Sequence, residues 1–405
     1  MKPSTPGFVG AALREARKAR GLTGALLAEK IDVTKQAISS YETGKSPSPD
    51  VAERICEVLH FPLSYFLNRP RTKLQRETPY FYRSMSATTR LARDEAEIKM
   101  EWLVHLSSIV ETFIELPQVN FPVIDLPSDP TKISDELIED IASQLRTFWG
   151  LGNGPISNSA WLLENNGAIV VRRRLNAETL DAFSIWVRGR PFIVLSSDKN
   201  CAARSRFDIA HELGHLILHR NVPELYIKTP EYFKLIEQQA HRFAGAIQFP
   251  ISSFAKEVSS ANLEVFRILK HRWNLSIAMM IKRAEDLDFL NERKRQALWR
   301  SYASSGWREQ EPLDDKLIVE KPRVIREAIE LLLSEEILSR SDILSEMNLY
   351  HGDVEDSCGL PSNFLNPKAG DILHLRRHLR QQEFSEVHDR PGKVIEFRPE
   401  EKLRN

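Results

Sequence analysis

Apolar residues recur at helical spacing along most of the chain. The first 70 residues carry four short amphipathic segments, expected as helices over 11–20, 23–31, 34–43 and 49–59. A much longer apolar face runs through Leu91, Ile98, Trp102, Leu106, Ile109 and Phe113. The spacing of these residues predicts a single long helix. Ser134 is expected to begin another helix, with an apolar face formed by Leu137, Ile141, Leu145 and Phe148.

Three short runs rich in β-branched and aromatic residues interrupt the helical pattern, at 168–172, 183–187 and 192–196. A tight turn, Arg188-Gly189-Arg190, joins the last two runs. Upstream of them, four prolines between Pro117 and Pro130 exclude a helix and predict an extended connector. After about residue 290 the pattern is helical again and ends in a polar tail. We therefore expect a multidomain chain that is mainly α, with a small α+β core.

Composition narrows the class of protein. Lysine and arginine together number 56, as do aspartate and glutamate, which excludes the strong field of a nucleic-acid coat or an acidic solvating protein. No apolar run approaches the roughly 18 residues that span a bilayer, and the first apolar stretch is too short for a signal peptide. The three cysteines lie far apart without CxxC spacing, which argues against a disulfide framework or a cysteine zinc site. We expect a cytoplasmic protein that does not bind membranes.

The strongest chemical signal is the stretch His211-Glu212-Leu-Gly-His215, which has the form HExxH. On a helix the two histidines lie one turn apart on the same face, where both imidazoles can bind one metal ion. Glu212 lies about 100° around the helix from His211, which makes it a poor third ligand. It can instead accept a proton from a water molecule on the open side of the metal. The motif thus predicts a metal site with Glu212 as the catalytic base.

A third protein ligand is required, and Glu237 is the first candidate. It lies in a second expected helix, beside an apolar stripe that would face the first, and a buried glutamate needs a partner. His241, one turn later on the same face, is an alternative or additional ligand. His219, one turn after His215, is expected either to orient a ligand by hydrogen bonding or to be purely structural. The donor set favours Zn²⁺, and Mn²⁺ or another divalent ion stays open.

This region resembles the ImmA/IrrE family of metallopeptidases, found in regulators of phage, mobile elements and stress responses. Besides the HELGH motif, the resemblance is carried by residues 81–84, 116–122, 149–156, 181–184, 190–195, 237–244 and 274–283. It implies a zincin-like domain with a small sheet, in which His211, His215 and Glu237 bind the metal and Glu212 is the general base. The family usually carries Asn where this chain has His241. By analogy with other zinc peptidases, the strand at 192–196 either offers an edge to a substrate peptide or packs inside the sheet.

The first 70 residues resemble the XRE (Cro/CI-type) helix-turn-helix, an all-α, lambda-repressor-like fold. Residues 12–23 and 27–49 carry the resemblance. Thr34 is expected to cap the helix that enters a major groove, where Gln36 would read a base edge and Lys35 or Lys45 would contact phosphate. Ser39 and Ser40 share the exposed side of that helix. The family usually carries Gln at the position of Gly24, so a domain kept for protein contacts is the alternative to DNA binding.

These patterns predict a helix-turn-helix domain over 1–70, a linker with a long helix and proline-rich connector over 71–131, a metallopeptidase domain over 132–290 and a helical accessory region with a polar tail over 291–405. The predicted function is a transcriptional regulator that binds a double-stranded DNA operator and carries a metal-dependent endopeptidase for a partner repressor. One alternative is a non-catalytic regulator or antitoxin that uses the metallopeptidase fold to bind a partner such as a toxin. The other is a pure transcription factor. A homodimer on two half-sites is compatible with each.

Overall fold

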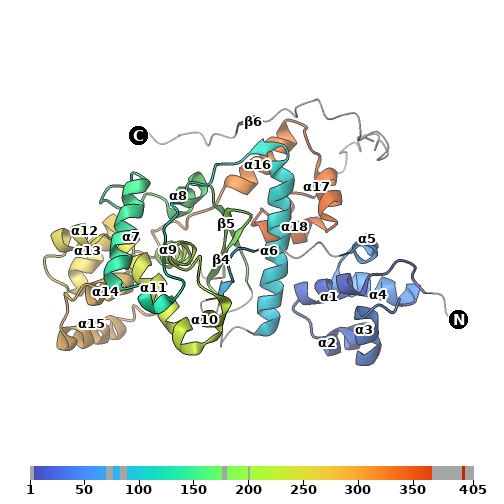
Figure 1. Ribbon diagram of the computed structural model, residues 1–405, viewed down its shortest axis with the longest axis horizontal. Coiled ribbons are helices and arrows are strands. Elements are labelled where there is room, and N and C mark those ends of the chain that lie inside the picture. The colour runs from blue at the N-terminus through green and yellow to red at the C-terminus, as the bar shows by residue number, and fades with distance from the viewer. Residues whose placement is uncertain are drawn as a thin grey trace. The chain divides into compact units, whose positions relative to one another are not determined.

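The computed structural model describes residues 4–69, 76–82, 89–175, 180–198 and 201–366, together with the short strand β6 (Ile395–Glu396) (Figure 1). The chain forms two compact units. The first combines residues 1–74, 86–117 and 324–405, and the second combines 75–85 and 118–323. Both are rich in helices, and the second contains a small mixed sheet, which confirms the expected fold class. Most of the predicted polar tail lies outside the described residues.

Four of the predicted helices are present at the start of the first unit, and each matches its expected bounds within about a residue. They are α1 (Gly10–Ala19), α2 (Gly24–Lys30), α3 (Lys35–Glu42) and α4 (Pro49–Leu59), followed by α5 (Leu63–Leu67), which the sequence pattern did not indicate. Thr23 and Thr34 cap α2 and α3, because the hydroxyl oxygen of each accepts a hydrogen bond from a backbone N–H three residues later, at 3.1 Å. Gly10 allows α1 to approach α3: a Cβ at this position would lie 2.1 Å from the carbonyl oxygen of Tyr41.

The remainder of the first unit is built around the long helix α6 (Arg90–Glu111), which ends before Phe113. It contacts α1, and it also contacts α16 (Val324–Ser334), α17 (Arg340–Met347) and α18 (His351–Cys358) from the end of the chain. Ion pairs hold these elements together: Lys99 Nζ lies 2.8 Å from a carboxylate oxygen of Asp356, and Arg20 pairs with Asp353. β2 (Ile114–Glu115) pairs in parallel with β6. The carboxy-terminal helices therefore fold back onto the amino-terminal part of the same unit.

The sheet of the second unit has the order β1-β4-β5-β3. Its strands are β1 (Phe81–Tyr82), β3 (Ile169–Arg173), β4 (Ala182–Val187) and β5 (Arg190–Ser196). β3 runs parallel to β5, whereas β4 is antiparallel to both β5 and β1. Arg188 and Gly189 both have positive φ angles, of 50° and 74°, as a two-residue hairpin turn requires. Because β5 lies between β4 and β3, the idea that the strand at 192–196 offers an open edge is wrong, and its packing inside the sheet is confirmed.

Helix α9 (Ala202–Leu218) lies between this sheet and α11 (Pro230–Gln248) (Figure 1). α7 (Asp135–Phe148) packs on the other side of α11, and Ser134 caps it as predicted, accepting a hydrogen bond from Leu137 N. Phe148 was expected on the buried face of α7 but is 51% exposed, because the helix ends there. The other helices of the unit are α8 (Ser159–Asn165), α10 (Glu224–Lys228), α12 (Ile251–Glu257), α13 (Leu263–Trp273), α14 (Ile277–Asp286) and α15 (Glu292–Ser304).

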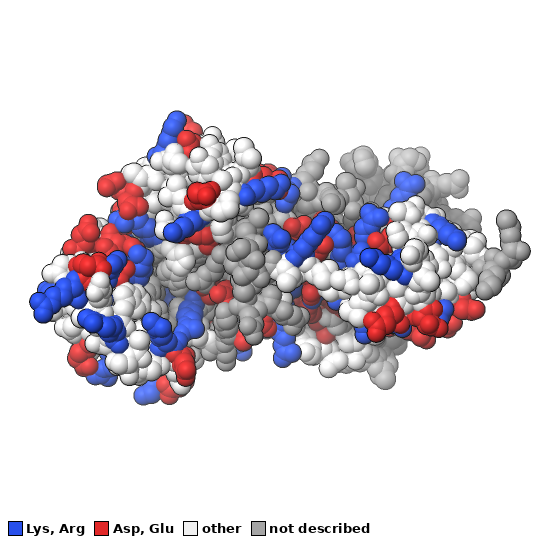
Figure 2. Space-filling model, turned by 90° about the horizontal axis from the view of Figure 1, so that it is seen from below, with Lys and Arg blue, Asp and Glu red and all other residues white. Residues whose placement is uncertain are grey.

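Buried ion pairs attach residues 311–323 to the second unit. Lys270, which is fully buried, donates to Glu311 at 2.7 Å and to Asp314 at 2.5 Å. Arg206 pairs with Glu320, and both side chains are buried. On the face seen in Figure 2, positive and negative side chains alternate over much of the surface, and acidic side chains gather along the edge at the lower right. Within the described part of the chain, no helix has the length and apolarity needed to cross a membrane.

Candidate metal centre and DNA-facing helix

Helix α9 brings His211 and His215 together on one face, as a separation of four residues in a helix requires. Their Nε2 atoms lie 3.0 Å apart, and both rings are buried. Glu237 on α11 completes the group. One of its carboxylate oxygens lies 3.4 Å from His211 Nε2, and the other lies 3.2 Å from His215 Nε2. Three donor atoms from two helices thus converge within 4.8 Å of one another.

The close approach of α9 and α11 depends on Gly214, between the two histidines. A Cβ on this residue would lie 3.2 Å from both the Cα and the carbonyl oxygen of Ala240, and 3.2 Å from a ring carbon of Phe243. Such separations are tighter than ordinary van der Waals contact. A residue without a side chain at this position therefore lets the Glu237 carboxylate approach both imidazoles.

The three residues suit a divalent cation by distance and by chemistry. In a tetrahedral zinc site with bonds of about 2.0–2.1 Å, neighbouring donor atoms lie about 3.3 Å apart, which is close to the separations of 3.0, 3.2 and 3.4 Å found here. Burial by itself raises the pKa of Glu237, but the adjacent imidazoles of His211 and His215 outweigh burial and lower it well below the usual value. Glu237 is therefore a carboxylate, and two nitrogens and one oxygen form the donor set of many zinc sites.

His219 and Gln239 define the protonation of His215. The side-chain amide of Gln239 donates to the carbonyl oxygens of Pro130 and Ile133, at 2.7 and 3.0 Å, so its oxygen faces His219 Nε2 at 3.1 Å and accepts from it. His219 is uncharged, because burial holds its pKa well below the usual value. Its Nδ1 therefore accepts the proton of His215 Nδ1, 3.0 Å away. The Nε2 lone pair of His215 is then directed at the Glu237 carboxylate, an arrangement that a cation stabilises.

Glu212 lies on the same turn of α9 but faces the sheet instead of Glu237. Ser184 in β4 donates its hydroxyl proton to Glu212 Oε2 at 2.6 Å. The Glu212 side chain is 1% exposed, and this burial raises its pKa to about 7. A carboxyl group with a pKa near neutrality can both accept and return a proton, which is the property that a general base needs.

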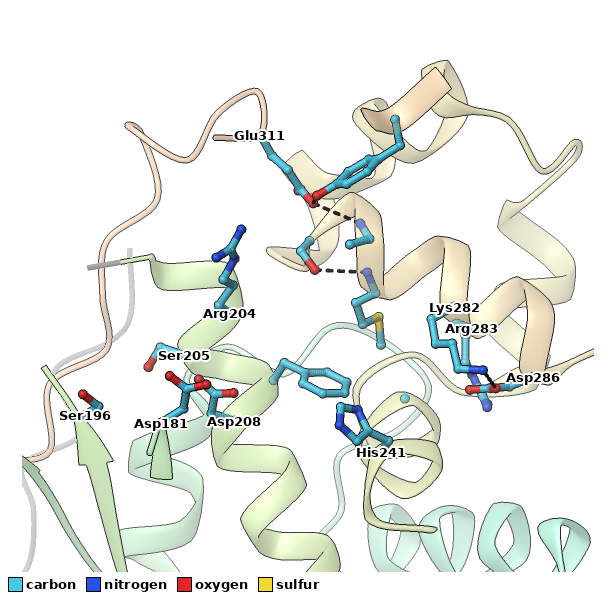
Figure 3. Close-up of a pocket in the computed structure, with 16 residues that line it drawn as sticks. Asp181, Ser196, Arg204, Ser205, Asp208, His241, Lys282, Arg283, Asp286 and Glu311 are labelled. Atoms are coloured by element: carbon cyan, nitrogen blue, oxygen red, sulfur yellow. Dashed lines mark hydrogen bonds and ion pairs between the residues drawn. The ribbon is translucent and has the colours of Figure 1, made fainter. Parts of the chain in front are cut away.

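His241 does not join the group of three. Its ring centre lies 4.6 Å from that of His211 and 5.2 Å from that of Phe207. Together with Phe207, Asp208 and Met279 it lines a pocket of about 370 Å³. Figure 3 labels His241 and Asp208 among the lining residues. Residues of α9, α11 and α14 line this pocket, and His241 lies in its wall, in ring contact with the metal ligand His211.

Sequence reasoning did not identify three residues that contact this site. Ser184 and Gln239 both lie in stretches that carry the family resemblance. However, Ser184 bonds to Glu212 and Gln239 bonds to His219, and residue spacing does not reveal either pair because each joins two different secondary-structure elements. Phe81 in β1 stacks on the ring of His215, with ring centres 4.6 Å apart and planes 10° apart. Its position, more than 130 residues before His215, gives no local signal of this contact.

The residues expected to contact DNA lie on and just after α3. Lys35, Gln36 and Ser39 are exposed on the helix, Ser40 is partly exposed, and Lys45 is exposed in the following turn. Nearby, a Cβ at Gly24 would lie 3.8 Å from a methyl group of Ile38, which is an ordinary contact. Packing therefore does not require a glycine at position 24. Leu26 in α2 is 39% exposed.

Two family models match the chain. Residues 13–66 match a model described as Helix-turn-helix, and residues 163–285 match a peptidase family described as IrrE N-terminal-like domain. These matches confirm both resemblances seen in the sequence. A comparison with curated proteins gave no match. The chain thus joins a helix-turn-helix domain of the XRE type to a metallopeptidase-like domain of the IrrE type.

Proposed function

We propose that this chain is a DNA-binding regulator whose metal-dependent endopeptidase cleaves a partner repressor. The observation that carries the proposal is the convergence of His211, His215 and Glu237. The proposed catalytic base is Glu212, which is buried on the same helix as the two histidines. A scaffold that only bound a partner would need neither a carboxyl group with a pKa near 7 nor a histidine with a defined lone pair. The proposed metal is Zn²⁺, and metal analysis distinguishes it from Mn²⁺.

In this mechanism His211, His215 and Glu237 hold the metal, and His219 and Gln239 keep His215 in the tautomer that can bind it. When bound, such a cation lowers the pKa of a water molecule toward about 7 and polarises a peptide carbonyl. Ser184 fixes one oxygen of Glu212, which leaves Oε1 to accept the proton of the attacking water. Glu212 then returns that proton to the nitrogen of the departing amine, so the base is restored after each cleavage.

The helix-turn-helix directs this activity to an operator. Exposed Lys35 and Lys45 supply phosphate contacts, and Gln36, Ser39 and Ser40 line the face of α3 that would enter the major groove. Binding to double-stranded DNA through phosphate contacts weakens steeply with salt, whereas docking of an apolar protein surface does not. Measuring operator affinity at several salt concentrations therefore separates DNA binding from protein binding by this domain.

The peptidase proposal is tested by metal analysis followed by incubation with the XRE-type repressor or the toxin from a neighbouring gene. The wild-type protein should contain about one zinc per chain and cut the partner at a defined bond. Glu212→Gln should abolish cleavage while folding and metal content stay unchanged, because this side chain is not a ligand. Stable metal content without cleavage of any partner would instead support the non-catalytic binding module.

A further inference from the structure

The outer edge of β4 is occupied by the chain's own residues 76–82. Arg76 forms a bridge with Val187, Glu77 N donates to the carbonyl oxygen of Trp186 at 3.0 Å, and Trp186 N donates to the hydroxyl of Thr78 at 3.0 Å. Phe81 then pairs with Ser184 in an antiparallel ladder. The segment 76–82 therefore runs antiparallel along the strand whose Ser184 holds the base Glu212.

Phe81 of this segment contacts the candidate metal centre directly. It is 2% exposed, and its ring stacks on one face of His215. The same ring packs in an apolar cluster with Val222, Ile227 and Ile236, the last of which precedes Glu237 on α11. Its side chain thus fills an apolar site that lies directly beside two metal ligands.

An extended peptide that binds to a sheet edge uses the free backbone groups of the edge strand for affinity and side-chain sites for specificity. In this structure both kinds of group beside Glu212 are taken, the backbone groups of β4 by the segment 76–82 and the apolar site by Phe81. Glu212 and His215 are each 1% exposed in this arrangement. A substrate strand that paired with β4 would have to displace the segment.

The regular ladder between the segment and β4 is short. β1 pairs with β4 through two residues, whereas β5 pairs with β4 through six. At the start of the segment, the Glu77 side chain bonds to Arg220 at 2.8 Å, and both side chains are 36% exposed, where ion pairs contribute little. The short ladder, the hydrogen bonds of Glu77 and Thr78 and the burial of Thr78, Tyr80 and Phe81 hold the segment, and Phe81 stacks on a metal ligand.

We propose that residues 76–82 are an internal occupant of the substrate-binding edge, which a substrate must displace. This inference rests on the proposed peptidase function. It assigns the substrate a chemical class: an extended protein segment that pairs antiparallel with β4 and places a large aromatic or apolar side chain where Phe81 now lies. The segment keeps the peptidase closed until such a strand competes for the edge.

The test uses the zinc-loaded full chain and a phenylalanine-containing dipeptide hydroxamate, which binds metal and needs no cleavage. Phe81→Ala should bind this probe at least about tenfold more tightly than the wild type, because the apparent affinity is reduced by the fraction of protein in the closed state. Glu77→Ala, which loosens the segment without emptying an apolar site, should give a smaller gain in the same direction. Phe254→Ala removes an equally buried aromatic ring from another cluster and should leave the affinity unchanged.

A synthetic peptide with the sequence of residues 76–82 adds a second readout. It should compete with the hydroxamate for the Phe81→Ala protein, and a scrambled peptide should not. Unchanged affinity in both Phe81→Ala and Glu77→Ala, with zinc bound, would overturn the inference and leave the peptidase proposal standing. A wild-type protein that binds no zinc would instead defeat the peptidase proposal, and with it the inference that rests on it.

Discussion

Replacing Gly214 by alanine tests whether the close contact between α9 and α11 determines the geometry of the metal centre. The added Cβ would lie 3.2 Å from two backbone atoms of Ala240 and 3.2 Å from the Phe243 ring. Because backbone atoms cannot rotate away as a flexible side chain can, α11 must move by a few tenths of an ångström. Gly214 precedes His215 directly, so this movement separates His215 from Glu237.

The magnitudes separate stability from metal affinity. Overpacking a well-packed interior costs about 1–3 kcal/mol, whereas alanine in place of glycine stabilises a helix interior by roughly 1 kcal/mol. We expect the metal-free protein to lose only about 0–2 kcal/mol of its free energy of unfolding. The helix propensity of alanine does not contribute to metal affinity. Metal–ligand distances in binding sites vary by only about 0.2 Å, so a shift of a few tenths of an ångström weakens binding. Zinc affinity should therefore fall at least about tenfold, which corresponds to about 1.4 kcal/mol.

Urea denaturation of the metal-free protein measures the first quantity, and competition with a chelator of known affinity measures the second. Gly352→Ala is the matched control, because a Cβ at this helical glycine of α18 would meet nothing within 4 Å. It should leave zinc affinity unchanged. If Gly214→Ala binds zinc as tightly as the wild type, the helix contact does not determine the positions of the ligands, and the reasoning is refuted.

Three further substitutions test other parts of the structure. Gln239→Leu should lower zinc affinity by about 10- to 100-fold, as the loss of a hydrogen-bonding partner behind a ligand does, because His219 then no longer orients His215. Gly24→Gln should fold normally and bind operator DNA about fivefold more tightly, since one added hydrogen bond contributes about 1 kcal/mol. Gly10→Ala should destabilise the helix-turn-helix by about 1–3 kcal/mol in thermal unfolding, because its Cβ would overlap a backbone oxygen.

Each of these predictions has an outcome that would contradict it. Gln248→Leu removes another buried glutamine from α11 that contacts Ser159 instead of the metal centre, so equal losses of zinc affinity in the two variants would contradict the role of Gln239. For Gly24→Gln, the contradicting outcome is a gain in operator affinity that stays the same at every salt concentration, because a phosphate contact must weaken as salt rises. For Gly10→Ala, unfolding at the same temperature as the wild type would contradict the prediction.

The local features of this protein follow from its sequence because they depend on neighbouring residues. Thr23, Thr34 and Ser134 cap helices where a hydroxyl residue precedes an apolar period, and each accepts the hydrogen bond expected of such a cap. The HExxH spacing likewise places His211 and His215 on one helical face wherever that helix packs. These properties need only the 3.6-residue period of a helix and the chemistry of the side chains.

Tertiary structure decided which distant residues complete the site. Phe81 pairs with Ser184, and the Gln239 amide donates a hydrogen bond to the carbonyl oxygen of Pro130; both contacts join segments far apart in the chain. His241, in contrast, lies outside the group of three ligands. Helical spacing placed His241 and Glu237 on one face but could not show how closely α11 approaches α9. That approach is set by packing at Gly214, where shape and not periodicity determines the contact. The sequence by itself therefore determined the chemistry available, and packing determined which groups meet.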